Sequence, residues 1–354
     1  MAFDSRPVAA ARFSDLGELN VVSNPVGGHA TPSEVMYPGG PQMDGGLLAE
    51  GDPVPENAGP NGRRPEWLKV RLGVGGTYAG TKSIVRGGAL NTVCEEARCP
   101  NIGECWALGT ATIMILGSVC TRNCGFCAID TGRPPITDLD EPRRVAEAVR
   151  QMQLQHVVIT MVARDDLPDG GAAIVAETIR QIRLATPATG IEVLISDLNG
   201  READIRTVVE ARPDILGHNV ETVPRLQRPV RRRARWDRSV SVLTHGAEVA
   251  RAIGFPEMVT KTGIMLGLGE TWDEVEEAMR LLREADVDVL TIGQYLRPSR
   301  QHLPLLKYYT PAEFTRLRRI GLEMGFRHVQ SGPLVRSSYH AAEQVPGRET
   351  AAAS

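Results

Sequence analysis

Residues 111–127 read A-T-I-M-I-L-G-S-V-C-T-R-N-C-G-F-C, an apolar run that leads into three closely spaced cysteines. The run from Ala111 to Leu116 has the length and composition of a buried strand, so the cysteines lie on the loop at its carboxyl end. Parallel α/β sheets and barrels bind their ligands at the carboxyl ends of strands. The sequence therefore predicts a ligand site on the loop that carries Cys120, Cys124 and Cys127.

All six cysteines of the 354-residue chain lie between Cys94 and Cys127. The first triad (Cys94, Cys99, Cys105) has the spacing C-x4-C-x5-C, and the second triad (Cys120, Cys124, Cys127) has the spacing C-x3-C-x2-C. A structural zinc site would supply four ligands in two pairs, and disulfides suit small secreted domains. Two iron–sulfur clusters, each with an iron left for a ligand other than cysteine, fit the triads better. Zinc and disulfides remain alternatives at this point.

Beyond the second triad, apolar runs alternate with amphipathic segments, a pattern typical of successive βα units around a parallel sheet. We expect strands near residues 111–116, 156–162, 191–195, 215–220, 259–265 and 289–296. Helices are expected near residues 141–153, 171–185, 202–211, 238–253, 272–285 and 311–325. Six repeats favour a partial barrel over a doubly wound sheet, although periodicity alone does not separate the two.

The composition, with 42% hydrophobic residues and a net charge of −3, is that of a soluble globular protein. No apolar run is long enough to span a membrane, and the near-neutral charge disfavours nucleic acid as the main partner. Residues 1–62 are rich in Gly, Pro, Ala and Asn, and we expect a disordered extension there. A first-triad segment at 63–110, the barrel at 111–330 and a C-terminal segment with a disordered tail at 331–354 should follow. The cytoplasm, which keeps thiols reduced, is the default location.

Three stretches of the chain resemble motifs of one family. C-T-R-N-C-G-F-C at residues 120–127 resembles the signature of radical S-adenosylmethionine (SAM) enzymes. N-T-V-C-E-E-A-R-C-P-N-I-G-E-C-W at residues 91–106 resembles the auxiliary-cluster motif of lipoyl synthases, and R-S-S-Y-H at residues 336–340 is similar to their C-terminal motif. The likeness runs nearly continuously from about Pro65 to His340, in the family's order.

The resemblance implies a partial (β/α)6 TIM-like barrel of the radical SAM type, with two 4Fe-4S clusters and SAM as cofactors. It implies that the second-triad cluster splits SAM, and that the deoxyadenosyl radical takes hydrogen from C6 and C8 of an octanoyl chain on a carrier lysine. It also implies that the first triad and Ser338, with Ser337 as the alternative, hold an auxiliary cluster that is sacrificed as the sulfur source. A serine oxygen is a harder iron ligand than a thiolate, which would help an iron leave.

The partners that the resemblance implies are octanoylated lipoyl carrier domains, namely 2-oxoacid dehydrogenase E2 subunits and the glycine cleavage H protein. An electron donor such as ferredoxin or flavodoxin and an iron–sulfur cluster carrier are implied as well. The alternatives are another two-cluster radical SAM enzyme, such as a methylthiotransferase or biotin synthase, and a non-catalytic metal-binding protein. The N-terminal position of the first triad and the terminal serine motif disfavour both a methylthiotransferase and biotin synthase.

Polar residues after the fourth expected strand are candidates for SAM contacts. In H-N-V-E at 218–221, the amide of Asn219 and the carboxylate of Glu221 suit ribose hydroxyls or the methionyl amine, whereas His218 is expected to be structural. The carboxylates of R-D-D-L-P-D-G-G at 164–171 suit turns and helix caps as well as ligand contacts. G-L-G-E-T at 267–271 lacks the full phosphate-binding fingerprint, and we expect it to pack closely under the cofactor.

V-R-R-R-A-R-W at 230–236 is the one dense basic stretch of the sequence. Here the chain departs from the resembled family, which tends to have Pro-Gly after the first arginine and Tyr near the tryptophan position. A charge run usually forms a solvated face. The alternative hypothesis is that this stretch docks an acidic carrier domain, whose approach electrostatic steering would speed.

Overall fold

The computed structural model describes residues 53–59, 63–69, 76–97, 99–107, 112–135, 137–338 and 341. Within these residues the largest sheet has eight strands in the order β1-β2-β5-β6-β7-β8-β9-β10. Neighbouring strands of this sheet run parallel except for β1, which is antiparallel to β2. The strands are β1 (Asn91–Thr92), β2 (Thr112–Ile115), β5 (His156–Met161), β6 (Gly190–Leu194), β7 (Ile215–Gly217), β8 (Val259–Leu266), β9 (Val289–Gln294) and β10 (His328–Gly332).

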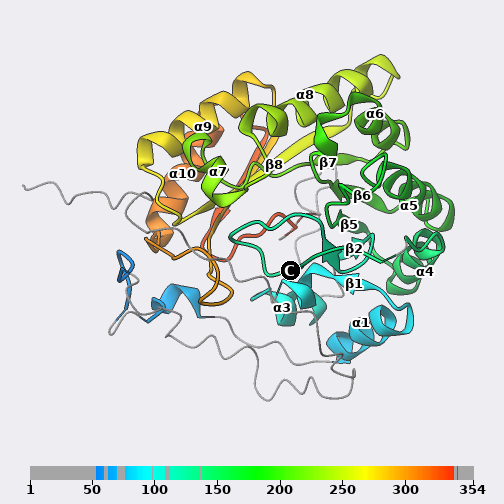
Figure 1. The fold of residues 1–354 in the computed structure, drawn as a ribbon, viewed down its shortest axis with the longest axis horizontal. Coiled ribbons are helices and arrows are strands. Elements are labelled where there is room, and N and C mark those ends of the chain that lie inside the picture. Colours follow the sequence, from blue (N-terminus) through cyan, green and yellow to red (C-terminus); the bar gives the residue numbers. More distant parts are fainter. Residues whose placement is uncertain are drawn as a thin grey trace, which may run out of the picture.

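Long helices connect the consecutive parallel strands, and Figure 1 shows them along the outer side of the curved sheet. They are α4 (Glu141–Met152), α5 (Ala172–Ala185), α6 (Glu202–Glu210), α8 (Trp236–Ala252), α9 (Trp272–Glu284) and α10 (Pro311–Glu323). All six predicted strands and all six predicted helices are confirmed, with ends that differ by a few residues. The predicted partial (β/α)6 barrel is confirmed as well. None of the described helices is long and apolar enough to cross a membrane.

Local chemistry explains where the helices begin. Thr271 caps α9 and Thr310 caps α10, and each threonine forms a capping box with a glutamate three residues later. Helix α9 then buries Val275, Ala278, Met279 and Leu282, whose spacing of three and four residues forms one apolar stripe. Helices of this kind bury one face against the sheet and leave the inner face of the barrel to the strands.

Strand β10 is a seventh parallel strand that the sequence did not predict. The sequence His328–Gly332 contains no apolar run, and Val329 is the only residue of the strand that is fully buried. It pairs with β9 from His328 opposite Val289 to Gly332 opposite Gly293. The chain that follows Gly332 therefore starts at the carboxyl ends of the strands.

The shorter elements lie before the barrel and in its loops. They are η3 (Glu66–Leu68), α1 (Gly76–Gly87), α2 (Val93–Glu96), α3 (Ile102–Ala107), β3 (Val119–Cys120), β4 (Asp130–Thr131), η4 (Leu198–Gly200), η5 (Pro224–Leu226) and α7 (Gln227–Val230). Tyr78 of α1 packs on Trp106 of α3 with ring centroids 5.3 Å apart. Leu68 is buried in the same apolar cluster as residues of β9 and α10, so the segment before the first triad packs against the barrel.

The expected disordered extension at residues 1–62 needs correction in its described part. Glu56 N–H donates to Leu306 O at 2.9 Å, and Tyr308 N–H donates to Glu56 O at 2.9 Å. Residues 53–59 therefore form a strap along the loop after β9, held by backbone hydrogen bonds that composition does not reveal. The remainder of residues 1–62 lies outside the described residues.

Charged side chains fill the amino-terminal half of the barrel interior. Lys261 of β8 donates from Nζ to both carboxylate oxygens of Glu192 on β6, at 2.8 and 2.9 Å, and both residues are buried. A buried ion pair of this kind is costly to break, because either partner alone would be an uncompensated buried charge. The space for ligands is consequently at the opposite end of the strands.

Candidate active site

A cavity of about 460 Å³ lies at the carboxyl ends of the strands, where the sequence predicts a ligand site. Its walls include Met114 of β2, Met161 of β5, Leu194 of β6 and Gln294 of β9. The cysteines that line it come from both triads: Cys94, Cys99, Cys120, Cys124 and Cys127. A cavity of this volume is in the range that binds small molecules and cofactors. The structure thus brings members of both triads to a single cavity, whereas Cys105 on α3 is not among the residues that line it.

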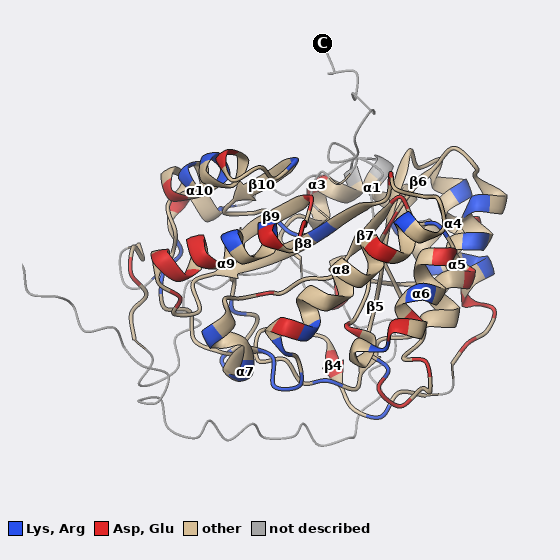
Figure 2. Ribbon diagram, turned by 90° about the horizontal axis from the view of Figure 1, so that it is seen from above, with Lys and Arg blue, Asp and Glu red and all other residues tan. Residues whose placement is uncertain are grey.

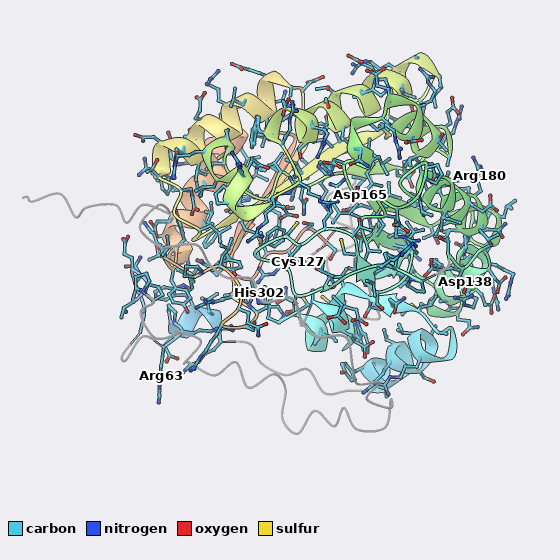
Figure 3. The ribbon with its side chains drawn as sticks, in the orientation of Figure 1. Arg63, Cys127, Asp138, Asp165, Arg180 and His302 are labelled. Atoms are coloured by element: carbon cyan, nitrogen blue, oxygen red, sulfur yellow. The ribbon has the colours of Figure 1, made fainter. Side chains whose placement is uncertain are left out.

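The loop that carries the second triad is held by the loop after β9. Leu303 N–H donates to Gly125 O at 2.9 Å, and His302 Nε2 donates to Cys127 O at 3.0 Å. Figure 3 shows Cys127 and His302 near each other in the middle of the molecule. Gly125 N–H in turn donates to Val230 O at 3.0 Å. The backbone between the cysteines is therefore fixed before any ligand binds.

Arg122 anchors the same loop from its other side. Its guanidinium binds Asp165 through Nε at 2.9 Å and Nη2 at 2.7 Å, and Nη2 also lies 2.6 Å from Asp197 Oδ1. Asp197 is fully buried and accepts a second bond from Arg238 Nε at 2.8 Å. Burial alone would raise the pKa of Asp197, but the bonds and charge of Arg122 lower it to about 2. The network is ionised at neutral pH and ties the cysteine loop to the ends of β5 and β6.

For thiols of both triads the effect of burial is the dominant one, and their pKa values rise. Burial raises the pKa of Cys124 to about 11, against the charge of Arg231, and the pKa of Cys127 to about 12. In the first triad burial raises the pKa of Cys94 to about 11 and that of Cys105 to about 12, and the neighbouring cysteines add to both shifts. Because thiolates bind metals and thiols do not, metal binding at either triad releases protons.

The first triad is tied to the C-terminal segment. Cys94 lies on α2, Cys105 lies on α3, and Cys99 N–H between them donates to Cys94 O at 3.1 Å. Asn101 Nδ2 donates to Leu334 O at 2.8 Å. Half-buried Arg336 also faces Cys99, whose charge opposes the lowering of the Arg336 pKa by burial. The surroundings of the triad therefore come from two parts of the chain that lie far apart in sequence.

Ser337 and Ser338 line the cavity but have different partners. Thr112 Oγ1 donates to Ser338 Oγ at 2.8 Å, and the Thr112 backbone amide is hydrogen-bonded to the Cys94 sulfur. Asn219 Nδ2 instead donates to Ser337 Oγ at 2.6 Å. Ser338 thus belongs to the surroundings of the first triad, whereas Ser337 belongs to the residues that end β7. Tyr339 and His340 of the same motif lie outside the described residues.

Asn219 and Glu221 reach the cavity from the end of β7. Asn219 is 9% exposed, and its Oδ1 has no hydrogen-bond partner among the described residues. A buried amide oxygen that faces a cavity without a partner is costly unless a ligand donates to it. Glu221 has a φ of +65°, a strained conformation for a non-glycine residue of the kind found at functional sites. Burial raises the pKa of its carboxyl group, and Arg231 opposes the shift.

Arg231 is a cavity residue that the sequence did not single out. It was grouped with its exposed neighbours as one basic stretch, yet it is buried and lines the cavity. Its Nη1 donates to Ser239 Oγ at 3.0 Å, and the same oxygen is 3.0 Å from His218 Nε2. His218 also donates from Nδ1 to Ile195 O at 2.9 Å, so both of its ring nitrogens have structural partners. Only a three-dimensional arrangement could separate Arg231 from the surface arginines.

Two other motifs do not line the cavity. Asp165 pairs with Arg122, Asp166 accepts from Arg164 Nη2 at 2.8 Å, and Asp169 accepts from the amides of Gly171 and Ala173 at the start of α5. In G-L-G-E-T, a Cβ at Gly267 would lie 2.6 Å from Lys307 O, so the glycine is required by close packing. That packing is on the loop after β9, not against the cavity.

The donor set of each triad fits an iron–sulfur cluster with a fourth ligand that is not cysteine. All six cysteines are free, and each triad has a polar group beside it in the cavity: Ser338 near the first, and Asn219 with Glu221 near the second. Among the described residues, no group of three Cys, His, Asp or Glu side chains meets the geometry for a single metal ion. A cluster binds thiolates through several irons, so it does not require the thiolates to converge on one point.

Family models match two parts of the chain. Residues 114–282 match the radical SAM superfamily, and residues 50–99 match the N-terminal domain of lipoyl synthase of the radical SAM family. The second match begins before Pro53 and therefore includes the strap at residues 53–59. Among solved structures, methylornithine synthase aligns with 61% of this chain and 70% of that chain, at 15% identity and a TM-score of 0.47.

Full-length relatives extend the match over most of the chain. The lipoyl synthase of Rubrobacter xylanophilus is 57% identical over 293 residues, which is 83% of this chain and 89% of that protein. The lipoyl synthase of Bacillus cytotoxicus is 57% identical over 284 residues, or 80% of this chain and 94% of that protein. On the strength of these relatives, and with cysteines of both triads and the terminal serines lining one cavity, the chain belongs to the lipoyl synthase family of radical SAM enzymes.

Proposed function

We propose that this chain inserts two sulfur atoms, at C6 and C8, into an octanoyl group that is amide-linked to a lysine of a carrier protein. The observation that carries the proposal is that cysteines of both triads line one cavity: Cys94 and Cys99 of the first, and Cys120, Cys124 and Cys127 of the second. Two groups that must act on the same carbon atoms in turn have to be within reach of one bound chain. A second site elsewhere on the surface would not satisfy that requirement.

The cofactors we propose are two 4Fe-4S clusters and SAM. The second triad would hold the cluster that binds SAM, and the first triad with Ser338 would hold the auxiliary cluster. When bound, these groups supply the one-electron chemistry that breaks unactivated C–H bonds and the sulfur atoms that replace the hydrogens. The hydrogen bond from Thr112 to Ser338, beside Cys94, supports Ser338 over Ser337 as the fourth ligand.

The protein's own groups bind and orient the reactants. Asn219 Nδ2 donates to Ser337 Oγ, which fixes the orientation of the amide, and Oδ1 has no partner among the described residues. Asn219 Oδ1 is therefore placed to accept a hydrogen bond from an amine or hydroxyl of SAM. Arg231 offers a positive charge beside Glu221 and Cys124. The apolar side chains of Met114, Met161 and Leu194 suit an octanoyl chain and keep water from the reacting carbons.

The partners we propose follow from the substrate. They are octanoylated carrier domains of 2-oxoacid dehydrogenase E2 subunits and of the glycine cleavage H protein, an electron donor such as ferredoxin or flavodoxin, and an iron–sulfur cluster carrier. The six free cysteines require a reducing compartment, and the cytoplasm is the one we propose.

The function is tested on the anaerobically reconstituted protein with dithionite, SAM and an octanoyl-lysine peptide, with products followed by mass spectrometry. We expect deoxyadenosine together with a peptide in which two hydrogens are replaced by two sulfurs. Deoxyadenosine without any gain of sulfur would assign radical SAM chemistry to a different substrate. A protein with both clusters that forms no deoxyadenosine would overturn the proposal.

A further inference from the structure

The segment between η5 and α8 carries a concentration of positive charge that the rest of the chain does not share. Residues 222–236 contain six arginines and no Asp or Glu, although the whole chain has a net charge of −3. Figure 2 shows this stretch as blue in the connection between α7 and α8. Like charges held close together repel one another, so such a stretch lowers the stability of the fold unless a partner compensates it.

Two of the six arginines are tied into the fold, and the other four have exposed side chains. Arg231 is buried in the cavity wall, and Arg225 pairs with Glu274 of α9. The other four are exposed and form what we call the arginine ridge: Arg228, Arg232, Arg233 and Arg235. Arg228 and Arg232 form no ion pair with any described residue. Arg235 pairs with Asp237, and Arg233 Nη1 lies 3.5 Å from Asp165 Oδ2, but both arginine side chains are about two-thirds exposed, a setting in which ion pairs contribute little.

The backbone under the ridge is fixed, so its charges are presented at defined positions. Ala234 N–H donates to Arg231 O at 2.9 Å, Arg231 N–H donates to Gln227 O at 2.7 Å, and the Arg233 carbonyl accepts from Arg238. Arg238 is itself held by buried Asp197. A binding surface whose backbone is already ordered loses less entropy when a partner docks.

The ridge adjoins the opening of the cavity. Arg233 and Ala234 line the cavity together with Arg231, so a single segment forms part of the wall and, through its exposed side chains, the adjoining surface. A substrate that is an acyl chain on a lysine arm enters the cavity while its carrier protein remains outside. The carrier surface beside that lysine must therefore lie against residues such as those of the ridge.

We propose that the arginine ridge binds an acidic surface next to the modified lysine of the carrier protein. This inference rests on the proposed function, because it takes the substrate to be protein-bound. Complementary charge at the rim of an interface raises the association rate and fixes the orientation of the partner, and salt weakens both effects. The ridge acts on the carrier and not on the octanoyl chain.

The test compares two substrates that differ only in what surrounds the octanoyl-lysine. One is an octanoylated carrier domain with acidic residues around the lysine, and the other is a short neutral octanoyl-lysine peptide. The variant is Arg228→Glu/Arg232→Glu, which avoids the cavity residues. The control is Arg180→Glu/Arg319→Glu, which changes the charge equally on α5 and α10, and Figure 3 shows Arg180 on the outer side of the molecule.

We expect the ridge variant to lower kcat/KM for the carrier domain by about tenfold at low ionic strength, and by much less in 0.5 M NaCl. We expect the kcat/KM of the ridge variant for the short peptide to change less than about twofold. The kcat/KM of the control variant should change less than about twofold for either substrate. An equal loss for both substrates, or no loss for either, would overturn the docking proposal. Stronger competition by an RNA oligonucleotide than by an acidic peptide of equal charge would also overturn it.

A direct binding measurement separates this proposal from the proposed function. Fluorescence anisotropy of a labelled octanoylated carrier domain reports docking even if no sulfur is inserted. Salt-sensitive binding that the ridge variant loses, without sulfur insertion by the wild type, would refute the function and keep the docking surface. Equal binding by the wild type and the ridge variant would refute the docking surface whatever the activity.

Discussion

The two neighbouring serines at 337 and 338 show how much one residue position decides in this molecule. One is hydrogen-bonded to Asn219 at the end of β7, and the other to Thr112 beside Cys94. The peptide unit that joins them spans about 3.8 Å between Cα atoms. The surroundings of the two triads are therefore in contact through adjacent residues, and each serine can be tested separately.

We predict that Ser338→Ala and Ser337→Ala impair different steps. Ser338→Ala should retain SAM cleavage and lose sulfur insertion, because it removes the proposed fourth ligand of the auxiliary cluster. Ser337→Ala should raise the KM for SAM about fivefold, the effect of one hydrogen bond, because the Asn219 amide loses its acceptor. Deoxyadenosine formation and sulfur gain, measured on the same samples, give the comparison. Identical profiles for the two variants would contradict the assignment.

The cysteines are expected to divide the labour in the same way. Cys94→Ala should retain SAM cleavage and stop sulfur insertion, whereas Cys120→Ala should stop both, since we propose that SAM binds at the second triad. The measurement is deoxyadenosine and sulfurated peptide by mass spectrometry, with iron content to verify that one cluster remains. If Cys94→Ala no longer cleaved SAM, the division between the triads would be wrong.

Among the elements, the loop between β3 and β4 depends most on its neighbours. Arg122 holds it to Asp165 and Asp197, and the loop after β9 holds it through His302 and Leu303. Contact with Leu303 is so close that a Cβ built on Gly125 would lie 2.8 Å from Leu303 Cγ. By contrast, a Cβ on Gly132 would meet only Val119 Cγ1 at 3.5 Å, an ordinary contact.

We predict that Gly125→Ala lowers stability by about 1–3 kcal/mol, the usual effect of overpacking, and reduces the iron bound at the second triad. Gly132→Ala is the matched control and should change neither. Gly125→Ala/Leu303→Ala should recover iron binding, because the smaller side chain removes the clash. Thermal unfolding and iron content are the measurements, and a double variant no better than Gly125→Ala would argue against this loop contact.

At the scale of the whole molecule, the barrel is charged at one end and reactive at the other. The pair of Lys261 and Glu192 fills the amino-terminal half, and the cavity occupies the carboxyl ends. His218 is a buried residue of the cavity wall. Burial, and next the charge of Arg231, lower its pKa to about 4 from the usual value near 6.5.

This shift predicts a pH dependence of global stability. Between pH 7 and pH 5 the unfolded chain takes up a proton at His218 that the folded chain does not, so the folded state loses about 2 kcal/mol relative to the unfolded state. The loss begins as the pH falls through 6.5 and ends near the folded pKa of about 4. Urea unfolding of the metal-free protein at both pH values measures this loss. The difference in the free energy of unfolding between pH 7 and pH 5 should be smaller for His218→Asn than for the wild type. An unchanged difference would show that His218 is protonated in the fold.

The sequence predicted the elements whose signal is local. Buried strands such as β5 and β8 are long apolar runs, helices such as α9 have an apolar stripe with a capping box, and the cysteine spacing itself identified the two triads. What it missed depends on contacts between distant residues. β10 has only one fully buried residue, the strap at 53–59 is held by backbone bonds to 306–308, and Arg231 differs from its neighbours only in the direction of its side chain.

The position of the serine segment after β10 has a practical consequence for enzyme preparations. Proteolytic trimming just before Ser337 would leave every strand and long helix of the barrel in place, because the last of them ends at Gly332. Circular dichroism and size exclusion would then report a well-folded protein, although groups beside both triads had been removed. The intact mass of the chain is consequently a better criterion of active material than its secondary structure. We expect a mixture of the full chain and the trimmed chain to show a specific activity in proportion to the fraction of full chain.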